Sequence, residues 1–452
     1  MLEDDLGLEV TTDSSEVIAA INRFTELALG YGKDALTVLQ EGIAADPTCA
    51  MLHAYAAAHF LSQENATDWK KATPHLQVAQ QHLGVITQRE QWYVQGIAAW
   101  AKGKIDRAIA LHEEIVQNFP RDLISVQQGQ YHYFYLGEKE KLLKIAEKVL
   151  SANRENHYLY GMVAFGLEQC RRLKQAEAVG RMATEMNRAD PWAHHAVAHV
   201  METQKRVDEG IAWMESLADA WENCNSMLYT HNWWHIALYY LERDDELHVL
   251  TLYDTRVWGR AQKESPKDQV GAIALLLRLQ LQGYDVGNRW LELSSHLLPR
   301  LEEHALAFQD LHYLYALAKG GRSDWLQQMQ LSMHKHSETV NPFLRWKWSR
   351  VAIPAAKGMI AHAKGDWLTA IALLKPVLPH LHEIGGSHAQ RVLFEQVYLD
   401  ALLQTEKVNR IYCTHQAKKP VISSFHDRIS FLPLMSPASR CQTELKDIPK
   451  YV

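Results

Sequence analysis

An internal repeat of about 34 residues constrains the fold of this chain more than any other feature. In the unit 89–122, Trp92 stands at position 4, Gly96 at 8, Ala99 at 11, Ala108 at 20 and Pro120 at 32. This is the pattern of a tetratricopeptide repeat, which folds as two antiparallel helices. Small residues are needed where the two helices cross, because larger side chains would push them apart.

The same register runs along most of the sequence. The clearest units are 16–49, 89–122, 157–190, 191–224 and 351–382. Unit 123–156 is the weakest, and residues 63–73 read as an insertion that shifts the phase. Segment 268–312 is helical but degenerate, a last helix is expected from about His388 to Gln404, and no segment predicts a strand. The prediction is therefore an all-α chain, an α/α superhelix (solenoid) of tetratricopeptide-like hairpins over residues 1–417, followed by an irregular tail over 418–452.

Composition limits the function and the compartment. The chain has 452 residues, 47% apolar and 22% charged, with a net charge of −6 and no long run of one sign. We therefore expect no partnership with nucleic acid or membranes that depends on bulk charge. No apolar segment follows the acidic N-terminus, so we expect no secretory signal. Five scattered cysteines without a Cys-x-x-Cys motif favour a reduced, cytoplasmic protein.

Histidines cluster on two predicted helices. The first opens at Asp190 and Pro191, which suit an N-cap and a first helical position. Side chains three or four residues apart share a helix face. His195, His199 and Glu202 therefore form one stripe, and His231 and His235 form another on the next first helix.

The repeat register places the first stripe in the concave groove. In a tetratricopeptide-like stack, the first helix of each pair lines this groove, with positions 2, 5, 9 and 12 pointing into it. In unit 191–224 these positions are Trp192, His195, His199 and Glu202. The small residues that set the register are independent of the histidines.

Five longer segments of the sequence are distinctive. They are 160–168 (YGMVAFGLE), 190–202 (DPWAHHAVAHVME), 231–238 (HNWWHIAL), 310–316 (DLHYLYA) and 385–396 (GGSHAQRVLFEQ). In content and order they resemble the tetratricopeptide repeat protein 38 family. The resemblance implies an all-helical repeat protein and assigns no biochemical activity. His194, which adds a second histidine beside His195, departs from the usual pattern, and the tail after about Lys418 has no matching block.

Three interpretations of the histidines stay open. His195, His199, His231 and His235 have spacings that would let paired imidazoles hold one zinc or iron ion. The same side chains, with Glu202, would also suit a pocket for a polar ligand or peptide. The third interpretation is a structural hydrogen-bonded network, since no His-Glu-x-x-His motif is present.

Neighbouring residues extend the candidate ligand site. We expect Trp234 to form a wall of the groove, Trp233 to lie in the core and Asn232 to contact a ligand or a polar network. Gly385-Gly386-Ser387 opens a helix on which His388 and Arg391 share a face, which suits either an anion site or a capped helix with an Arg391–Glu395 pair. Asp310 and His312 do not share a helix face, so no dyad is expected there.

These residues favour a binding protein that holds a small polar ligand or a peptide segment in its groove. The alternative is an enzyme, with His195, His199, Glu202 and His235 as acid–base groups or with some of them holding a catalytic metal, as in a metal-dependent hydrolase or oxidase. A protein–protein adaptor with structural histidines is the second alternative. The sequence predicts neither a particular ligand nor an oligomeric state.

Overall fold

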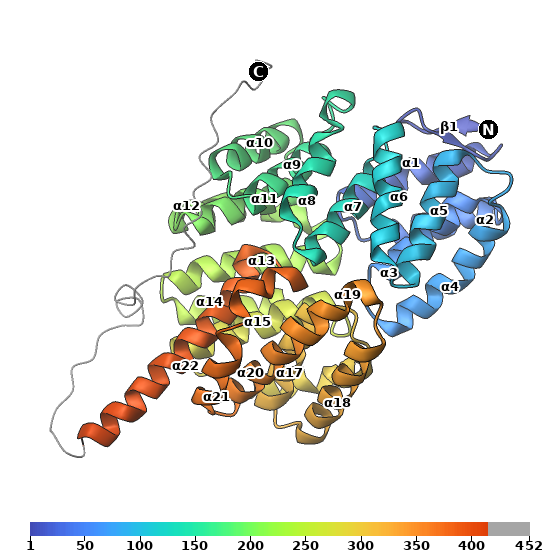
Figure 1. Ribbon diagram of the computed structural model, residues 1–452. Helices are drawn as coiled ribbons and strands as arrows, with labels where there is room; N and C mark the ends of the chain where they lie inside the picture. Colours follow the sequence, from blue (N-terminus) through green and yellow to red (C-terminus); the bar gives the residue numbers. More distant parts are fainter. Residues whose placement is uncertain (415–452) are drawn as a thin grey trace, which may run out of the picture. The chain divides into compact units, whose positions relative to one another are not determined.

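Residues 1–414 are described in the computed structural model, and nearly all of them belong to helices or the short turns between them (Figure 1). The predicted all-α, helical-repeat fold is confirmed. An antiparallel hairpin of β1 (Leu2–Glu3) and β2 (Glu9–Val10) precedes the first helix. The expectation of no strand was wrong here, because strands of two residues are too short to show an alternating pattern.

The helices follow one another as hairpins. In the first half they are α1 (Ser15–Leu29) with α2 (Ala35–Ala45), α3 (Ala50–Leu61) with α4 (Ala66–Gln81), α5 (Gln88–Ala101) with α6 (Ile105–Asn118), α7 (Leu123–Leu136) with α8 (Lys139–Glu147), α9 (His157–Gln169) with α10 (Leu173–Met186), and α11 (Pro191–Thr203) with α12 (Val207–Glu215). The second half has α13 (Ser226–Glu242), α14 (Glu246–Leu252), α15 (Pro266–Gln282), α16 (Arg289–Ser294), α17 (Ala307–Lys319), α18 (Ser323–Thr339), α19 (Pro342–Lys347), α20 (Ile353–Ala363), α21 (Trp367–Leu374) and α22 (His388–Thr414). Shorter segments, 3₁₀ or π in type, are η1 (Leu150–Ala152), η2 (Ala218–Asn223), η3 (Tyr253–Val257), η4 (Ser295–Glu302), η5 (Trp348–Ala352) and η6 (Leu378–Ile384).

The helix starts reproduce the sequence repeat. First helices begin at Gln88, Leu123, His157 and Pro191, at the interval of about 34 residues typical of tetratricopeptide-like repeats. The weakest unit, 123–156, still forms the pair α7 and α8. Residues 63–73 are not an insertion, because they form a turn and the beginning of α4. The shift in repeat phase comes from the length of α4, the second helix of its hairpin.

The two helices of a hairpin differ in burial. Nearly every residue of α11 is buried, including its histidines, whereas α10 buries only Ala176, Gly180 and Ala183. First helices contact the next first helix at α9–α11, α11–α13 and α13–α15. The candidate histidines therefore stand on the inner layer of helices, where side chains are withdrawn from solvent.

Residues Met1–Glu406 form one compact unit, and a second unit begins at Lys407. Helix α22 continues ten residues beyond the predicted end at Gln404, to Thr414. The tail predicted over 418–452 lies outside the described residues. None of the helices within residues 1–414 has the length and apolar character needed to cross a membrane.

Contacts between distant segments close the first unit around its interior. The turn after α1 pairs with the start of α13, where Asn225 N donates to the Tyr31 carbonyl at 2.6 Å. Lys267 of α15 donates to the Ser62 carbonyl at 2.7 Å, and Glu303 accepts from Ala66 N at 3.0 Å. These contacts join the first repeats to the second half of the chain.

Candidate functional site

Helices α11 and α13 carry the histidine cluster, and local sequence explains where α11 starts. Asp190 caps it as predicted, with Oδ1 accepting from the backbone N–H groups of Trp192 and Ala193, both at 3.1 Å. Pro191 occupies the first turn, where its missing N–H costs nothing. Asp190 Oδ2 lies 2.9 Å from His157 Nδ1 of the preceding repeat. The start of α11 is thus held from two sides.

Four histidine rings meet between these helices. His195 Nε2 lies 2.9 Å from His199 Nε2 and 3.1 Å from His231 Nε2. The His235 ring centroid lies 4.5 Å from that of His199 and 5.0 Å from that of His195. One nitrogen from each of the four rings lies within 4.8 Å of all the others. The structure therefore brings together both histidine stripes predicted from the sequence.

The nitrogen contacts in this cluster conflict with one another. An imidazole nitrogen carries either one proton or one lone pair, so it can make one good hydrogen bond. His195 Nε2 faces two other Nε2 atoms, and both contacts cannot be satisfied at once. His195 Nδ1 and His235 Nε2 are buried and have no hydrogen-bond partner among the described residues. Each such group costs about 1–3 kcal/mol when nothing else binds it.

Burial keeps the cluster neutral. Removal from water lowers the pKa of His195, His199 and His231 well below the ordinary histidine range, and the other imidazoles of the cluster add to this effect. Burial also lowers the pKa of His235 to about 3, with a smaller contribution from the charge of Arg278. At neutral pH the rings therefore keep lone pairs that can bind a cation or accept a hydrogen bond.

Two carboxylates flank the rings. Glu202 Oε2 lies 3.1 Å from His235 Nδ1, and Glu168 Oε2 lies 3.9 Å from His199 Nδ1. Burial raises the pKa of Glu168 to about 7, and that of Glu202 is raised for the same reason. The sequence analysis missed Glu168. It holds position 12 of unit 157–190, just as Glu202 does in the next unit, and this equivalence was the available signal.

Aromatic rings enclose the cluster, although not as expected. Trp192 packs on His195 with ring centroids 4.6 Å apart. Trp234 stacks on His231 at 5.2 Å, is only 1% exposed and lies behind the histidine rather than along the open cavity. Trp233 is partly exposed, with the Arg256 guanidinium over its ring. The expectation that Trp234 forms the wall was wrong, because Trp234 faces the interior packed around α15, and Trp233 also lies outside the lining, packed against the core.

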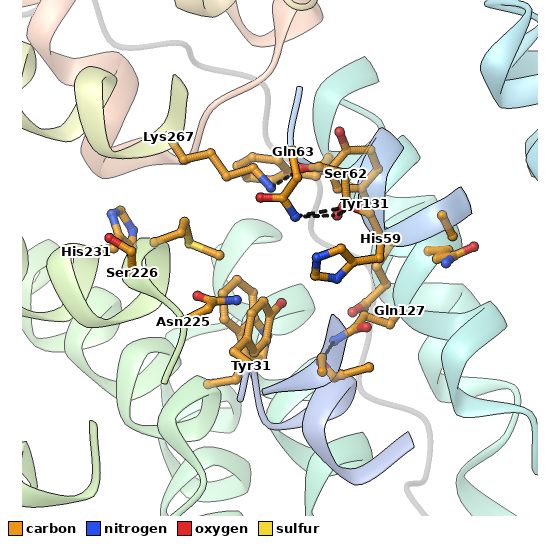
Figure 2. Close-up of a pocket in the computed structure, with 18 of the residues that line it drawn as sticks. Tyr31, His59, Ser62, Gln63, Gln127, Tyr131, Asn225, Ser226, His231 and Lys267 are labelled. Carbon is orange, nitrogen blue, oxygen red and sulfur yellow. Dashed lines mark hydrogen bonds between the residues drawn. The ribbon is translucent and has the colours of Figure 1, made fainter. Parts of the chain in front are cut away.

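A cavity of about 570 Å³ opens beside the cluster, and Trp192, His195, His199 and His231 reach it. Figure 2 shows His231 and Ser226 on one side, with His59 and Gln127 across from them. Aromatic side chains form much of the lining. They are Phe24, Tyr31, Tyr55, Phe60, Trp100, Tyr131, Phe134, Tyr135, Tyr158, Phe165, Trp192 and Phe308.

Polar groups of the lining are mostly amides and hydroxyls. The amides are Gln63, Gln127, Gln128, Gln130, Asn225, Gln262, Gln309 and Gln390. The lysines are already engaged: Lys71 pairs with Asp68 at 2.7 Å, and Lys267 Nζ lies 3.3 Å from Glu64. Lys33 donates to the Glu222 carbonyl at 3.2 Å. The cavity therefore favours uncharged ligands that carry hydrogen-bonding groups and apolar or aromatic parts.

The remaining predicted ligand residues lie outside this lining. Asn232 is buried, with Nδ2 3.5 Å from the Pro191 carbonyl and no partner for its Oδ1 among the described residues. His388 Nε2 contacts the Gln169 carbonyl at 3.0 Å, and Arg391 contacts the Gly386 carbonyl and His388 Nδ1. These contacts favour the capped-helix interpretation. Ser387 Oγ accepts a hydrogen bond from Gln390 N and so caps the helix. Arg391 donates to the Gly386 carbonyl instead of forming the expected pair with Glu395.

Asp310 and His312 do not meet, as predicted. Asp310 Oδ2 instead lies 2.6 Å from His304 Nδ1, and His304 Nε2 lies 2.8 Å from Ser332 Oγ. The three residues form a hydrogen-bonded line that sequence reasoning missed, because it joins the turn before α17 to α17 and α18. None of them belongs to the lining of the cavity described above.

Comparison with known proteins finds distant structural likenesses. No family model matches the chain. Among solved structures, it is similar to the Rap protein complexed with competence and sporulation factor, at 14% identity over 72% of this chain and 99% of that one (TM-score 0.43). It is also similar to a human IFIT1 dimer with m7Gppp-AAAA, at 12% identity over 91% and 98% of the two chains (TM-score 0.42). A third similar structure is the APC/C hetero-tetramer Cut9–Hcn1, at 11% identity over 86% and 75% (TM-score 0.37). It is the repeated hairpins, at intervals of about 34 residues, that make the chain a tetratricopeptide-like helical-repeat protein.

Proposed function

We propose that this protein binds a small uncharged ligand or a short peptide inside the cavity enclosed by its repeats. The observation that carries the proposal is the lining, which combines aromatic rings, side-chain amides and paired charges in one space of about 570 Å³. Small-molecule sites commonly have volumes of about 300–1,000 Å³ with an apolar wall and a few polar groups. The amides match the donors and acceptors of a peptide bond.

Two finer assignments belong to the same proposal. The first is membership of the tetratricopeptide repeat protein 38 family, which we propose on the resemblance of the segments quoted above. The second is a setting in the reducing cytoplasm, which accords with the free thiols of Cys49, Cys170 and Cys224.

Gly271 offers a direct test. It lies on α15 at the cavity, and a Cβ added there would meet no atom within 4 Å. A Gly271→Leu substitution would therefore extend from an uncrowded Cβ position at the cavity and take up part of its space. It would also stabilise α15 by about 0.5–1 kcal/mol, because glycine is unfavourable inside a helix.

The measurement is affinity-selection mass spectrometry with a mixture of tripeptides and N-acylated amino acids. We expect the wild-type chain to retain a subset of the mixture and Gly271→Leu to retain at least about tenfold less, a loss of about 1.4 kcal/mol in binding. The matched control is Gly84→Leu, because Gly84 lies in an exposed turn and its added Cβ also meets nothing within 4 Å. Equal retention by all three proteins would contradict the proposal.

A further inference from the structure

We propose that His195, His199, His231 and His235 bind a divalent transition metal, with Zn²⁺ as the expected ion, in the wall of the cavity. The cluster supplies four nitrogens within 4.8 Å of one another from two adjacent helices. Nitrogen donors of this kind are typical ligands of zinc. The site goes beyond ligand binding, and the ion site itself does not depend on the proposed ligand.

The distances are close to those of a zinc site. With Zn–N bonds of about 2.0–2.1 Å, the ligand nitrogens of a tetrahedral site lie about 3.3–3.4 Å apart. The Nε2 atom of His195 lies 2.9 Å from that of His199 and 3.1 Å from that of His231. Small ring rotations would open these contacts to the required spacing. A proton on His195 Nε2 can be donated to only one of the two facing nitrogens. A cation at the centre would instead be bound by the lone pairs of all these nitrogens at once.

The second nitrogen of His235 is placed as in known metal sites, and that of His199 points towards a second carboxylate at a longer distance. Metal-bound histidines usually donate their other N–H to a carboxylate or carbonyl, which orients the ring. His235 Nδ1 contacts Glu202 Oε2 at 3.1 Å, which leaves its unpartnered Nε2 beside the three other rings. Glu168 lies 3.9 Å from His199 Nδ1. When ionised, these two carboxylates balance the charge of a divalent ion held by neutral ligands.

The cavity gives the ion a route to the four histidines and leaves room for a fifth, exchangeable ligand. His195, His199 and His231 line the cavity, whereas His235 stands behind them. An ion in the cluster therefore faces the open space, where an oxygen or sulfur donor of a bound molecule would approach it. Binding of the cavity ligand to the ion rests on the proposed function, whereas binding of the ion to the four histidines does not.

The test begins with the full, untagged chain. After incubation with Zn²⁺ and removal of excess ion, elemental analysis is expected to find about one zinc per chain. With Co²⁺ as a spectroscopic substitute, the visible ligand-field bands of tetrahedral nitrogen coordination are expected. His199→Gln and His235→Gln should each lose the bound metal, and Glu202→Gln should weaken its affinity by about 10–100-fold.

His194→Gln is the matched control. His194 stands next to His195, is equally buried and accepts a hydrogen bond from Trp221 Nε1 at 3.1 Å, away from the cluster. It should keep the metal although it loses a comparable internal contact. Circular dichroism of each variant verifies that loss of metal is not loss of fold.

Several results would overturn the site. They are a folded wild-type chain that takes up neither Zn²⁺ nor Co²⁺, unchanged affinity in His199→Gln, and X-ray absorption of the zinc-loaded wild type that shows few nitrogen ligands. The last measurement needs no variant, so it decides the question even if the substituted chains fail to fold. Gly271→Leu separates the two proposals, because it should lose the cavity ligand while retaining zinc.

Discussion

At the scale of single residues, histidines that are buried without a partner should make this protein sensitive to acid. Both ring nitrogens of His112 on α6 are buried without a hydrogen-bond partner among the described residues, and burial lowers its pKa to about 4. The unfolded chain takes up a proton there below about pH 6.5, which the folded chain resists until about pH 4. The contribution of His112 to the free energy of unfolding is therefore fully present above pH 6.5, and it is lost as the pH drops from 6.5 towards 4.

We expect the His112→Leu substitution to flatten this dependence. The wild type should lose about 2 kcal/mol of unfolding free energy at this residue between pH 6.5 and pH 5. The variant should lack that loss, and at pH 7 it should be as stable as the wild type or more stable, because two unsatisfied nitrogens are removed. Urea titrations at both pH values measure the effect, and parallel curves for the two proteins would contradict it.

Residue identities at the cluster were predictable, but their surroundings were not. Helical spacing predicted that His195 and His199 share a face, and the repeat register predicted that this face is internal. Neither reveals that Trp233 and Trp234 both lie outside the cavity lining, since that depends on the rotation of α13 against α15. Glu168 was also missed, because each repeat unit was considered by itself and position 12 was not compared between units.

At the scale of helices, two glycines that the repeat pattern places at small-residue positions have different neighbours. They are Gly210, at position 20 of unit 191–224, and Gly96, at position 8 of unit 89–122. A Cβ on Gly210 of α12 would lie 2.3 Å from the Tyr239 ring, which is held by its hydroxyl donating to the Ala198 carbonyl at 2.7 Å. A Cβ on Gly96 of α5 would lie 3.6 Å from Leu111, an ordinary contact. The repeat pattern predicts that helices cross closely at both glycines, but it does not predict the size of the side chain that faces each glycine from the neighbouring helix.

Gly210→Ala should therefore destabilise the chain by about 1–3 kcal/mol through overpacking. Gly96→Ala is its matched control and should stabilise the chain by about 0.5–1 kcal/mol through helix propensity. The apparent melting temperatures should move in opposite directions. If both variants were equally stable, the close contact at Tyr239 would not be rigid.

Helix positions were thus well predicted wherever small residues recur at the repeat interval. The prediction failed at residues 63–73, where the shift in repeat phase suggested an insertion, although most of these residues belong to α4, which also accommodates Pro74 in its interior. Local propensity is a weak guide when tertiary packing stabilises the helix.

At the scale of the whole folded unit, enclosure of the cavity could not be predicted. Curvature of a repeat protein accumulates from small rotations at every repeat. Contacts such as that between Asn225 and Tyr31 follow from this sum and leave no local pattern in the sequence. The sequence predicted a groove, whereas the structure has first and second halves in contact around a cavity.

Glu64 is the residue at which this closure can be tested. It is 2% exposed and accepts hydrogen bonds from Tyr131 at 2.8 Å and Gln309 at 2.5 Å, while Lys267 Nζ lies 3.3 Å away. It therefore joins the turn between α3 and α4 to α7, α15 and α17. Glu64→Ala would leave three polar groups without their shared partner, at a cost of about 2–4 kcal/mol.

Because these contacts span the two halves, we expect the loss of Glu64 to act at a distance along the chain. Hydrogen exchange should accelerate together in residues 62–66 and at the start of α15, while the outer helix α10 keeps its protection. Lys71→Ala is the control, since it removes an exposed ion pair within α4 that contributes about 0–1 kcal/mol. Faster exchange confined to residues 62–66 would show that the two halves are held together by other contacts, so that Glu64 only secures its own turn.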